Sequence, residues 1–165
     1  MAGVRFATEE DAQAVAGIYA PYVRDTVISF EEVIPSANEM RIRIRRILAT
    51  HPFLVFEDGG SVIAYAYATP HKERAAYRWS VDVAVYAKLE VHRRGIGRAL
   101  YIRLFEILLR QGFHSAFAGI TLPNDKSVGL HEAMGFRKIG IYAETGFKFG
   151  AWQDVGWWGR SIASG

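Results

Sequence analysis

The hydrophobic pattern of the chain changes its period between residues 79 and 112. Over residues 79–87, Val81, Val83 and Val85 alternate with more polar neighbours, which is typical of a half-buried strand. From residue 95 to residue 111 apolar side chains recur at helical spacing, and Gly112 follows them as a C-cap. Because such a strand and such a helix each need to bury one apolar face, the fold must combine a sheet with packed helices.

Shorter signals place the other elements around this unit. Thr8 and Ser36 precede acidic residues in the N-cap pattern and predict two helices, and Asp58-Gly59-Gly60 predicts a hairpin turn. The predicted strands cover residues 4–6, 53–57, 61–69, 79–87, 115–122, 137–143 and 151–160, and the predicted helices cover about residues 9–22, 37–51, 95–111 and 124–134. This order predicts an α+β fold with a mixed, mostly antiparallel sheet flanked by helices.

Length and composition limit the remaining possibilities. The 165 residues, 50% hydrophobic and 22% charged, fit one domain spanning residues 1–165. The absence of Cys removes disulfides, thiol nucleophiles and Cys-ligated metals, and we expect no metal. A net charge of +3 is too small to indicate nucleic acid. No apolar run approaches the roughly 18 residues of a membrane span and no signal peptide is recognised, so we expect a cytoplasmic protein without membrane contact.

Residues 92–98, with the sequence HRRGIGR, connect the strand to the helix. Two glycines let a ligand approach the backbone, and free N–H groups at a helix N-terminus favour a phosphate or pyrophosphate. Arg93, Arg94 and Arg98 add positive charge. The segment lacks the Gly-Lys-Ser/Thr of a P-loop and the third small residue of a dinucleotide fingerprint. Taken alone, Gly95 and Gly97 fit a tight turn equally well.

A second basic feature lies on the predicted helix after Ser36. Its polar face carries Arg41, Arg43, Arg45 and Arg46. This stripe fits either a solvated helix face or an RNA-binding surface. We expect the solvated face, because charged runs on helices usually point to water.

The glycine segment resembles the (Gln/Arg)-x-x-Gly-x-(Gly/Ala) motif of the GNAT N-acetyltransferase superfamily, with His92 in place of its first residue. The order of predicted elements resembles that fold over nearly the whole chain, and Asn124 with residues 131–136 resembles its second cosubstrate segment. The resemblance implies acetyl-CoA as the cosubstrate, held by the loop amides and by the end of the preceding strand. The residues it implies are Val85, Tyr86, Ala87, Arg93, Arg94, Gly95, Ile96, Gly97, Arg98 and Asn124.

Within the superfamily, scattered segments resemble the phosphinothricin acetyltransferase group. They include residues 70–74, 76–79, 122–125 and 146–148. The resemblance implies an acceptor that is a small amino acid or an analogue, such as phosphinothricin, methionine sulfoximine or methionine sulfone, acetylated on its α-amine. It also implies a homodimer.

Two residues are candidates for proton transfer. An amine must be neutral to attack a thioester, whereas a free α-amine has a pKa of about 7.7–8.0, so a base assists. Asp82 lies on the polar face of its strand, where the group carries a Glu, which implies a general base acting directly or through water; a structural hydrogen bond is the alternative. His131 occupies the position implied to protonate the departing thiolate, and a structural histidine is the alternative.

The loop before the Asp82 strand is basic and suits an anionic acceptor. Arg74 is our candidate for a carboxylate or phosphinate, with an ordinary exposed arginine as the alternative. Phe30 and Tyr77, at positions resembling the substrate region of the group, are candidates for walling the acceptor side chain, or for core packing.

Because no Cys is available for a covalent acetyl-enzyme, we expect direct transfer in a ternary complex of protein, acetyl-CoA and amine. Two alternatives stay open. One is a GNAT enzyme acting on a protein N-terminus or another amine, and the other is a non-catalytic module that binds acyl-CoA or RNA.

Overall fold

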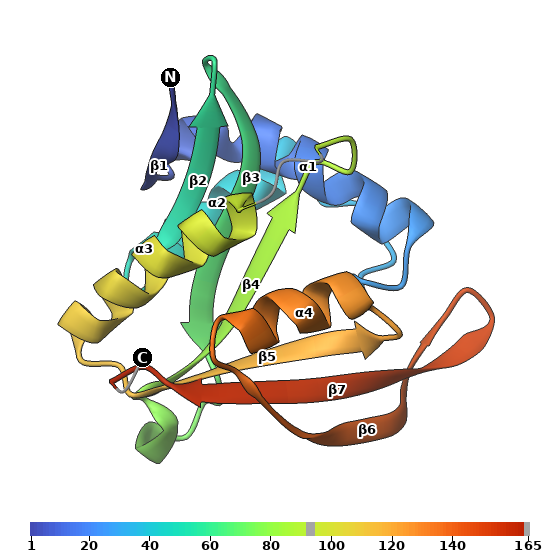
Figure 1. The fold of residues 1–165 in the computed structure, drawn as a ribbon. Coiled ribbons are helices and arrows are strands. Elements are labelled where there is room, and N and C mark those ends of the chain that lie inside the picture. Colours follow the sequence, from blue (N-terminus) through green and yellow to red (C-terminus); the bar gives the residue numbers. More distant parts are fainter. Residues whose placement is uncertain (92–94, 164–165) are drawn as a thin grey trace.

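A computed structural model describes residues 1–91 and 95–163 of the chain. Seven strands form one sheet in the order β1-β2-β3-β4-β5-β7-β6 (Figure 1). The strands are β1 (Ala2–Phe6), β2 (Phe53–Asp58), β3 (Ser61–Pro70), β4 (Ser80–Ala87), β5 (Ser115–Leu122), β6 (Arg137–Lys148) and β7 (Ala151–Ser161). The helices are α1 (Ala12–Asp25), α2 (Ala37–Leu48), α3 (Ile96–Gln111) and α4 (Asp125–Ala133), with short 3₁₀ turns at Glu9–Asp11 and Ala75–Tyr77.

Helices cover both faces of the sheet. Helices α1 and α2 pack on one face, around buried side chains that include Ile18, Ile44 and Tyr65. Helices α3 and α4 lie on the other face, where α3 buries Leu100 and Leu104 among others (Figure 1). The alternation of β4 follows these layers: Val81 and Val83 belong to the cluster under α3, which leaves Asp82 on the opposite face.

The sheet opens between its two central strands. β4 and β5 run parallel and pair only at three positions, the last of which joins Asp82 to Phe117. Beyond that point β4 stays paired with β3, and β5 stays paired with β7 (Figure 1). The ends of β4 and β5 therefore diverge and leave a gap in the ladder at the centre of the sheet.

The predicted α+β class and the predicted order of elements are confirmed. Two boundaries differ for physical reasons. The first helix begins with a 3₁₀ turn and continues past Pro21 to Asp25, since Val23 is buried in the core. β6 extends to Lys148 because pairing resumes at Gly146 after an irregularity, where the Glu144 amide donates to the Asp154 side chain at 2.8 Å.

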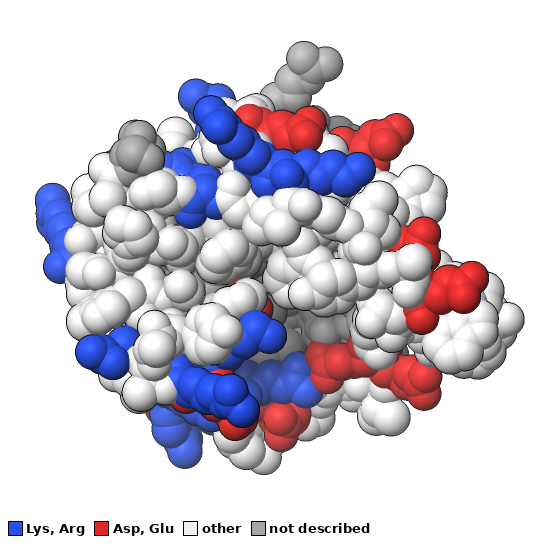
Figure 2. All heavy atoms as spheres, turned by 90° about the horizontal axis from the view of Figure 1, so that it is seen from below, with Lys and Arg blue, Asp and Glu red and all other residues white. Residues whose placement is uncertain are grey.

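The arginines of α2 mostly face acidic partners. Arg43 pairs with Glu31 and Glu39, and Arg45 pairs with Glu9. The face seen in Figure 2 carries Lys, Arg, Asp and Glu side chains around its rim, with mostly uncharged side chains between them. These pairings fit the expected solvated helix face.

None of the helices in the described ranges is long and apolar enough to cross a membrane. The same ranges contain no group of three His, Cys, Asp or Glu side chains arranged to hold a metal ion.

Candidate active site

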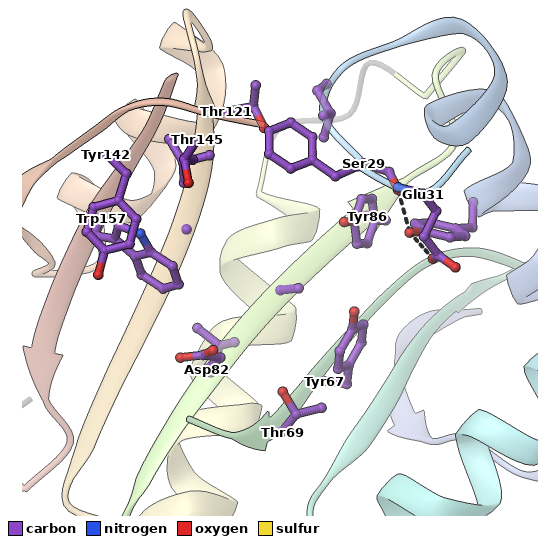
Figure 3. A pocket seen from close by; sticks show the side chains of 17 residues that line it. Ser29, Glu31, Tyr67, Thr69, Asp82, Tyr86, Thr121, Tyr142, Thr145 and Trp157 are labelled. Atoms are coloured by element: carbon purple, nitrogen blue, oxygen red, sulfur yellow. Dashed lines mark hydrogen bonds between the residues drawn. The ribbon is translucent and has the colours of Figure 1, made fainter. Parts of the chain in front are cut away.

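A cavity of about 660 Å³ lies where β4 and β5 separate (Figure 3). Its walls come from α1, from the loop after α1 and from the five strands β3, β4, β5, β6 and β7. The residues that line it are Tyr19, Ile28, Ser29, Phe30, Glu31, Tyr67, Thr69, Asp82, Val83, Ala84, Tyr86, Gly119, Thr121, Tyr142, Thr145, Val155 and Trp157. Among these residues the only charged side chains are two carboxylates, so the cavity favours an ammonium group over an anion.

Asp82 is the carboxylate closest to the opening of the sheet. Its Oδ1 lies 2.6 Å from Nδ1 of His71, just beyond β3, and its side chain is one-third exposed. Burial raises the pKa of Asp82 above its usual value, and the hydrogen bond from His71 opposes that rise. The structure therefore provides a partly desolvated carboxylate inside the cavity, as a general base requires.

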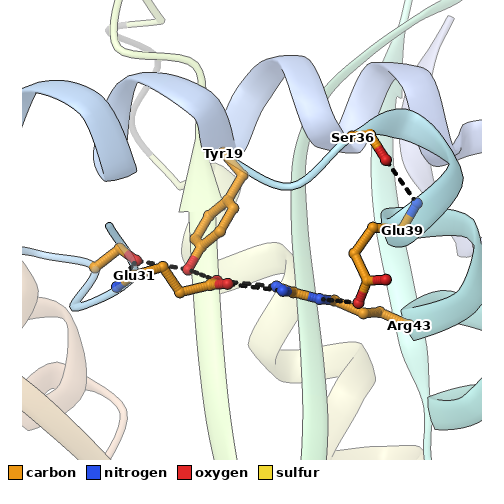
Figure 4. A network of polar contacts seen from close by, with 6 residues as sticks. Tyr19, Glu31, Ser36, Glu39 and Arg43 are labelled. Carbon is orange, nitrogen blue, oxygen red and sulfur yellow. Dashed lines mark hydrogen bonds and ion pairs between the residues drawn. The ribbon is translucent and has the colours of Figure 1, made fainter. Parts of the chain in front are cut away.

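The second carboxylate, Glu31, is neutralised by a polar network (Figure 4). Arg43 of α2 donates to both Glu31 oxygens, at 2.7 and 2.9 Å, and the Tyr19 hydroxyl donates to Glu31 and contacts Ser29 at 2.6 Å. Arg43 holds the pKa of Glu31 below its usual value. Glu31 therefore anchors the loop that walls the cavity and is not available as a base.

The same loop is also held from β6. The Phe30 ring lies where Gly146 has no side chain, since a Cβ on Gly146 would come within 2.2 Å of it. Lys148, almost fully buried, donates to the carbonyls of Val23 and Ser29 at 2.8 and 2.6 Å. Phe30, a predicted substrate residue, thus lines the cavity on a loop fixed from two sides.

A smaller cavity of about 60 Å³ adjoins the first between the separating strands. It shares Val83, Ala84, Tyr86, Gly119 and Thr121 with the larger cavity and continues to Val85, Asn124, Ser127 and His131. The two cavities therefore form one cleft that passes through the opening of the sheet. Asp82 lines only its larger part, which we term the acceptor side.

Beyond the pairing of Asp82 with Phe117, the backbone of β4 has no strand on its β5 side. Lys88 N donates to Ile63 O at 2.9 Å and His71 N donates to Ser80 O at 3.3 Å, which fixes the alternation of the β3–β4 ladder. By that alternation the backbone groups of Val83, Val85 and Ala87 point away from β3. The parallel pairing of Asp82 with Phe117 uses the Val83 amide, so the Val83 carbonyl and the backbone groups of Val85 and Ala87 face the cleft. Those of Tyr86 pair with Tyr65.

The sequence predicts Val85, Tyr86 and Ala87 as the strand residues that hold the cosubstrate. In the described ranges, only Val85 of these three keeps both its amide and its carbonyl free for a ligand. The Tyr22 hydroxyl donates to the Ala87 carbonyl, which leaves Ala87 only its amide. Tyr86 contributes its ring, stacked on Tyr65, as part of the wall. The sequence did not single out Val83, whose position is set by the divergence of β4 from β5.

The first turn of α3 lies next to this edge of β4. Gly95 is its N-cap, with φ at +89°, and Ile96 is buried beneath it. A Cβ on Gly97 would lie 3.0 Å from Leu130 Cδ2 and 3.9 Å from Val85 Cγ2, so glycine lets the turn approach both α4 and β4. The Arg98 side chain is exposed and lines a separate groove with Ile102 and Phe105. Predicted residues Arg93 and Arg94, with His92, lie outside the described residues.

His131 and Asn124 line the small cavity and are both engaged within the protein. Nδ1 of His131 lies 2.7 Å from the Ser127 carbonyl, which can only accept, so Nε2 accepts from the Tyr101 hydroxyl at 2.9 Å. Burial lowers the pKa of His131, which favours the neutral ring. Asn124 caps α4 by accepting from Ser127 N at 3.2 Å. The structure thus gives His131 no free ring proton for the predicted acid role.

Two predicted acceptor residues lie outside the cavity. Arg74 and Tyr77 are exposed in the turn before β4 and are not among the lining residues, and the Tyr77 ring packs on the edge of His71 instead. In their place the cavity offers Trp157, whose ring lies over Gly119. Its Nε1–H is buried without a hydrogen-bond partner in the described part of the chain. A buried unpaired donor in a cavity wall fits a ligand oxygen.

Comparison with known proteins agrees with this geometry. The family model described as "Acetyltransferase (GNAT) domain" matches residues 4–157. The chain belongs to the GNAT acetyltransferase family. This membership confirms the predicted enzyme class, an N-acetyltransferase. The cleft of the enzyme lies where β4 diverges from β5.

Individual relatives narrow the resemblance of this GNAT chain. It is 40% identical over 159 residues to a phosphinothricin N-acetyltransferase of Streptomyces viridochromogenes, covering 96% of this chain and 87% of the relative. It is 31% identical over 153 residues to an L-methionine sulfoximine/L-methionine sulfone acetyltransferase of Salmonella typhimurium, covering 92% and 90%. A phosphinothricin acetyltransferase from Sinorhizobium meliloti, solved with acetyl-CoA, superposes with a TM-score of 0.94 at 36% identity, covering 99% and 90%.

Proposed function

We propose that this GNAT enzyme transfers the acetyl group of acetyl-CoA to the α-amine of a small amino acid or analogue, such as phosphinothricin, methionine sulfoximine or methionine sulfone. The transfer is direct, in a ternary complex. One observation carries this proposal: the two cavities share walls across the opening of the sheet, with Asp82 facing the larger one. Two substrates that enter from opposite sides would therefore meet beside a carboxylate.

The narrow side of the cleft suits acetyl-CoA. The Val83 carbonyl and both backbone groups of Val85 match an extended amide-containing arm, and the unpaired amides at the start of α3 match a pyrophosphate. Gly95, Ile96 and Gly97 supply that turn, and Asn124 keeps a free side-chain amide nitrogen while its oxygen caps α4. Ala87 adds its amide, and the proposal retains Arg93, Arg94 and Arg98 as countercharge.

On the acceptor side, Asp82 takes a proton from the acceptor ammonium and so frees the amine to attack the thioester carbonyl carbon. A C–N bond forms, the C–S bond breaks, and CoA leaves as the thiolate, which takes up the second amine proton. The net products are the N-acetyl compound, CoA-SH and one proton. A backbone N–H from β4 would stabilise the carbonyl oxygen as it gains charge. His131 keeps its neutral ring in the wall beside the departing sulfur.

The rest of the acceptor cavity favours a compact, oxygen-bearing side chain. Trp157 offers an unpaired N–H, and Phe30 and Tyr142 add aromatic walls (Figure 3). The Streptomyces and Salmonella relatives are described as acting on phosphinothricin and on methionine sulfoximine or sulfone, all of which carry such oxygens. Arg74 and Tyr77 then belong to the rim, where Arg74 attracts the acceptor carboxylate on approach.

We further propose a single domain that assembles as a cytoplasmic homodimer. β6 is an edge strand with an unusual share of exposed apolar side chains, among them Ile139, Ile141 and Phe147. Trp152 of β7 is 61% exposed on the same hairpin. A second copy covering this hairpin would remove these side chains from water. The absence of Cys fits a reducing compartment.

The test is release of CoA-SH from acetyl-CoA with a panel of acceptors: the three analogues, common amino acids, a peptide with a free N-terminus and an aminoglycoside. We expect turnover with the analogues and none with the aminoglycoside. Preferential turnover of the peptide would replace the proposal with a protein N-terminus as acceptor. Binding of acetyl-CoA without turnover of any amine would favour the non-catalytic module.

A further inference from the structure

The contact between His71 and Asp82 is the shortest link from the proposed base to a second titratable side chain. Nδ1 of His71 and Oδ1 of Asp82 are 2.6 Å apart. The histidine lies just beyond β3 and the aspartate in β4, and the backbone bond from His71 N to Ser80 O holds the two strands in register there. Ladder geometry and the side-chain contact therefore fix this pair together.

The ring of His71 also packs against aromatic side chains of β5 and β7. It stacks on Phe117 of β5, with centroids 4.5 Å apart and planes at 29°, and meets the edge of Trp157 at 6.2 Å. Its side chain is only 18% exposed. Such a ring has little freedom to rotate, so its Nδ1–H stays directed at the carboxylate.

We propose that His71 is the positioning residue for the general base, and that the working unit of this enzyme is a His71–Asp82 dyad. His71 donates to Oδ1 and leaves Oδ2 without a protein donor in the described ranges, free to accept the ammonium proton. That proton then passes to solvent when the product leaves. The inference rests on the proposed function, because it assigns a helper to the base of that reaction.

The partial burial of Asp82 explains why such a partner helps. Desolvation disfavours the charged form of the carboxylate and raises its pKa, which reduces the ionised fraction that can act as a base. The donated hydrogen bond from His71 stabilises the charged form and orients it at once. The other groups that interact with Asp82 do not stabilise its charge as directly: Lys72 is exposed in the same loop, and burial raises the pKa of Tyr67 of β3, which keeps its phenol neutral.

Two variants separate the hydrogen bond from the packing. His71→Phe keeps a ring over Phe117 and removes the donor. His71→Asn places an amide nitrogen where Nδ1 was and removes the ring. The chain also offers a matched control, His51, whose ring stacks on Phe113 at 5.0 Å and 29° but contacts the Thr50 hydroxyl instead of a carboxylate. His51→Phe should therefore reproduce any effect of losing a stacked histidine alone.

The first readout is kcat/KM for the acceptor at pH 6 and at pH 9. In His71→Phe we expect a loss of about tenfold at pH 6, the usual size for a hydrogen bond to a charged group, and of less than about twofold at pH 9. At pH 9 the base is ionised in both proteins, and a larger share of the amine is neutral than at pH 6. His71→Asn and His51→Phe should stay within about twofold of wild type at both pH values. Equal losses in His71→Phe at both pH values would overturn the dyad and leave a packing role.

The second readout needs no turnover. The carbon-13 signal of the Asp82 carboxyl, followed by NMR against pH, should titrate at higher pH in His71→Phe than in wild type, His71→Asn or His51→Phe. An unchanged midpoint in His71→Phe would overturn the inference even if the enzyme is active. Absence of turnover in wild type would instead count against the proposed function, while the NMR titration still decides whether the dyad exists.

Discussion

The two sides of the cleft are built in different ways. The cosubstrate side uses the backbone edge of β4 and the first turn of α3, which are close together in the sequence. The acceptor side uses side chains that come from the loop after α1, from β3 to β7 and from the turn beyond β3. The first depends on where the backbone runs, and the second depends on contacts between segments that are remote in the chain.

This difference predicts that a substitution should affect only the substrate that binds on its own side of the cleft. A change on the acceptor side should alter kcat or the acceptor KM and leave acetyl-CoA binding unchanged. A change in the α3 turn should do the reverse. Four variants test this separation, beginning with the largest effect.

Asp82→Asn should cause the largest loss. The amide keeps the shape of the side chain but cannot take a proton, so kcat should fall by about 10²- to 10⁴-fold at neutral pH. The loss should shrink as the pH rises through the pKa of the acceptor amine, since a neutral amine needs no base. The dissociation constant of acetyl-CoA, measured by calorimetry, should stay within about twofold. Weakened acetyl-CoA binding would show that Asp82 serves both sides of the cleft.

Gly97→Val tests the cosubstrate side. A Cβ at this position already lies 3.0 Å from Leu130 Cδ2, so a larger side chain would push the turn away from α4 and β4. Loss of one or two backbone hydrogen bonds to a pyrophosphate should raise the KM for acetyl-CoA by about 10- to 100-fold, with little change in the acceptor KM. Gly129→Val gives the control, because it adds the same side chain to a helical glycine with open space around it.

The contrast between local backbone structure and contacts remote in the chain also explains which features could be predicted from the sequence. The order of the elements follows from local periodicity, and the α3 turn follows from Gly95 and Gly97, whose spacing needs only neighbouring residues. The free backbone edge at Val85 could not be predicted, because it depends on where β4 and β5 separate. Local patterns carry no information on such a divergence.

The acceptor side was harder for the same reason. Asp82 and Phe30 were found through their resemblance to a known group, but Arg74 was expected to bind an anion and lies outside the cavity. A basic loop indicates charge and not position, and Arg74, at the N-cap of the 3₁₀ turn at Ala75–Tyr77, is exposed. The unpaired N–H of Trp157 depends on β7 lying beside β5, a contact that no spacing in the sequence reveals.

Gly146→Ala tests the remote contact that holds the acceptor loop. The added Cβ would meet the Phe30 ring at 2.2 Å, so Phe30 and the loop that carries Ser29 must shift. Misplacing one wall of a binding site costs affinity, and we expect the acceptor KM to rise by about tenfold. Gly140→Ala on the same strand, where a Cβ meets nothing within 4 Å, is the matched control and should leave both KM values unchanged. A rise in the KM of Gly146→Ala for acetyl-CoA would show that the two sides of the cleft are coupled and would contradict their separation.

Trp157→Phe should give the smallest effect and the most specific one. Phenylalanine keeps an aromatic ring over Gly119 and removes the unpaired Nε1–H, so only a hydrogen bond to the acceptor is lost. A neutral hydrogen bond contributes about 0.5–1.5 kcal/mol, which corresponds to a rise in acceptor KM of about 2- to 13-fold. Trp152→Phe, on the exposed end of the same strand, controls for the change of ring. Removing a buried donor that has no partner stabilises the free protein and does not affect ligand binding. An unchanged acceptor KM together with a more stable fold would therefore show that the indole N–H is an unpaired group in the wall. The acceptor oxygens would then bind elsewhere.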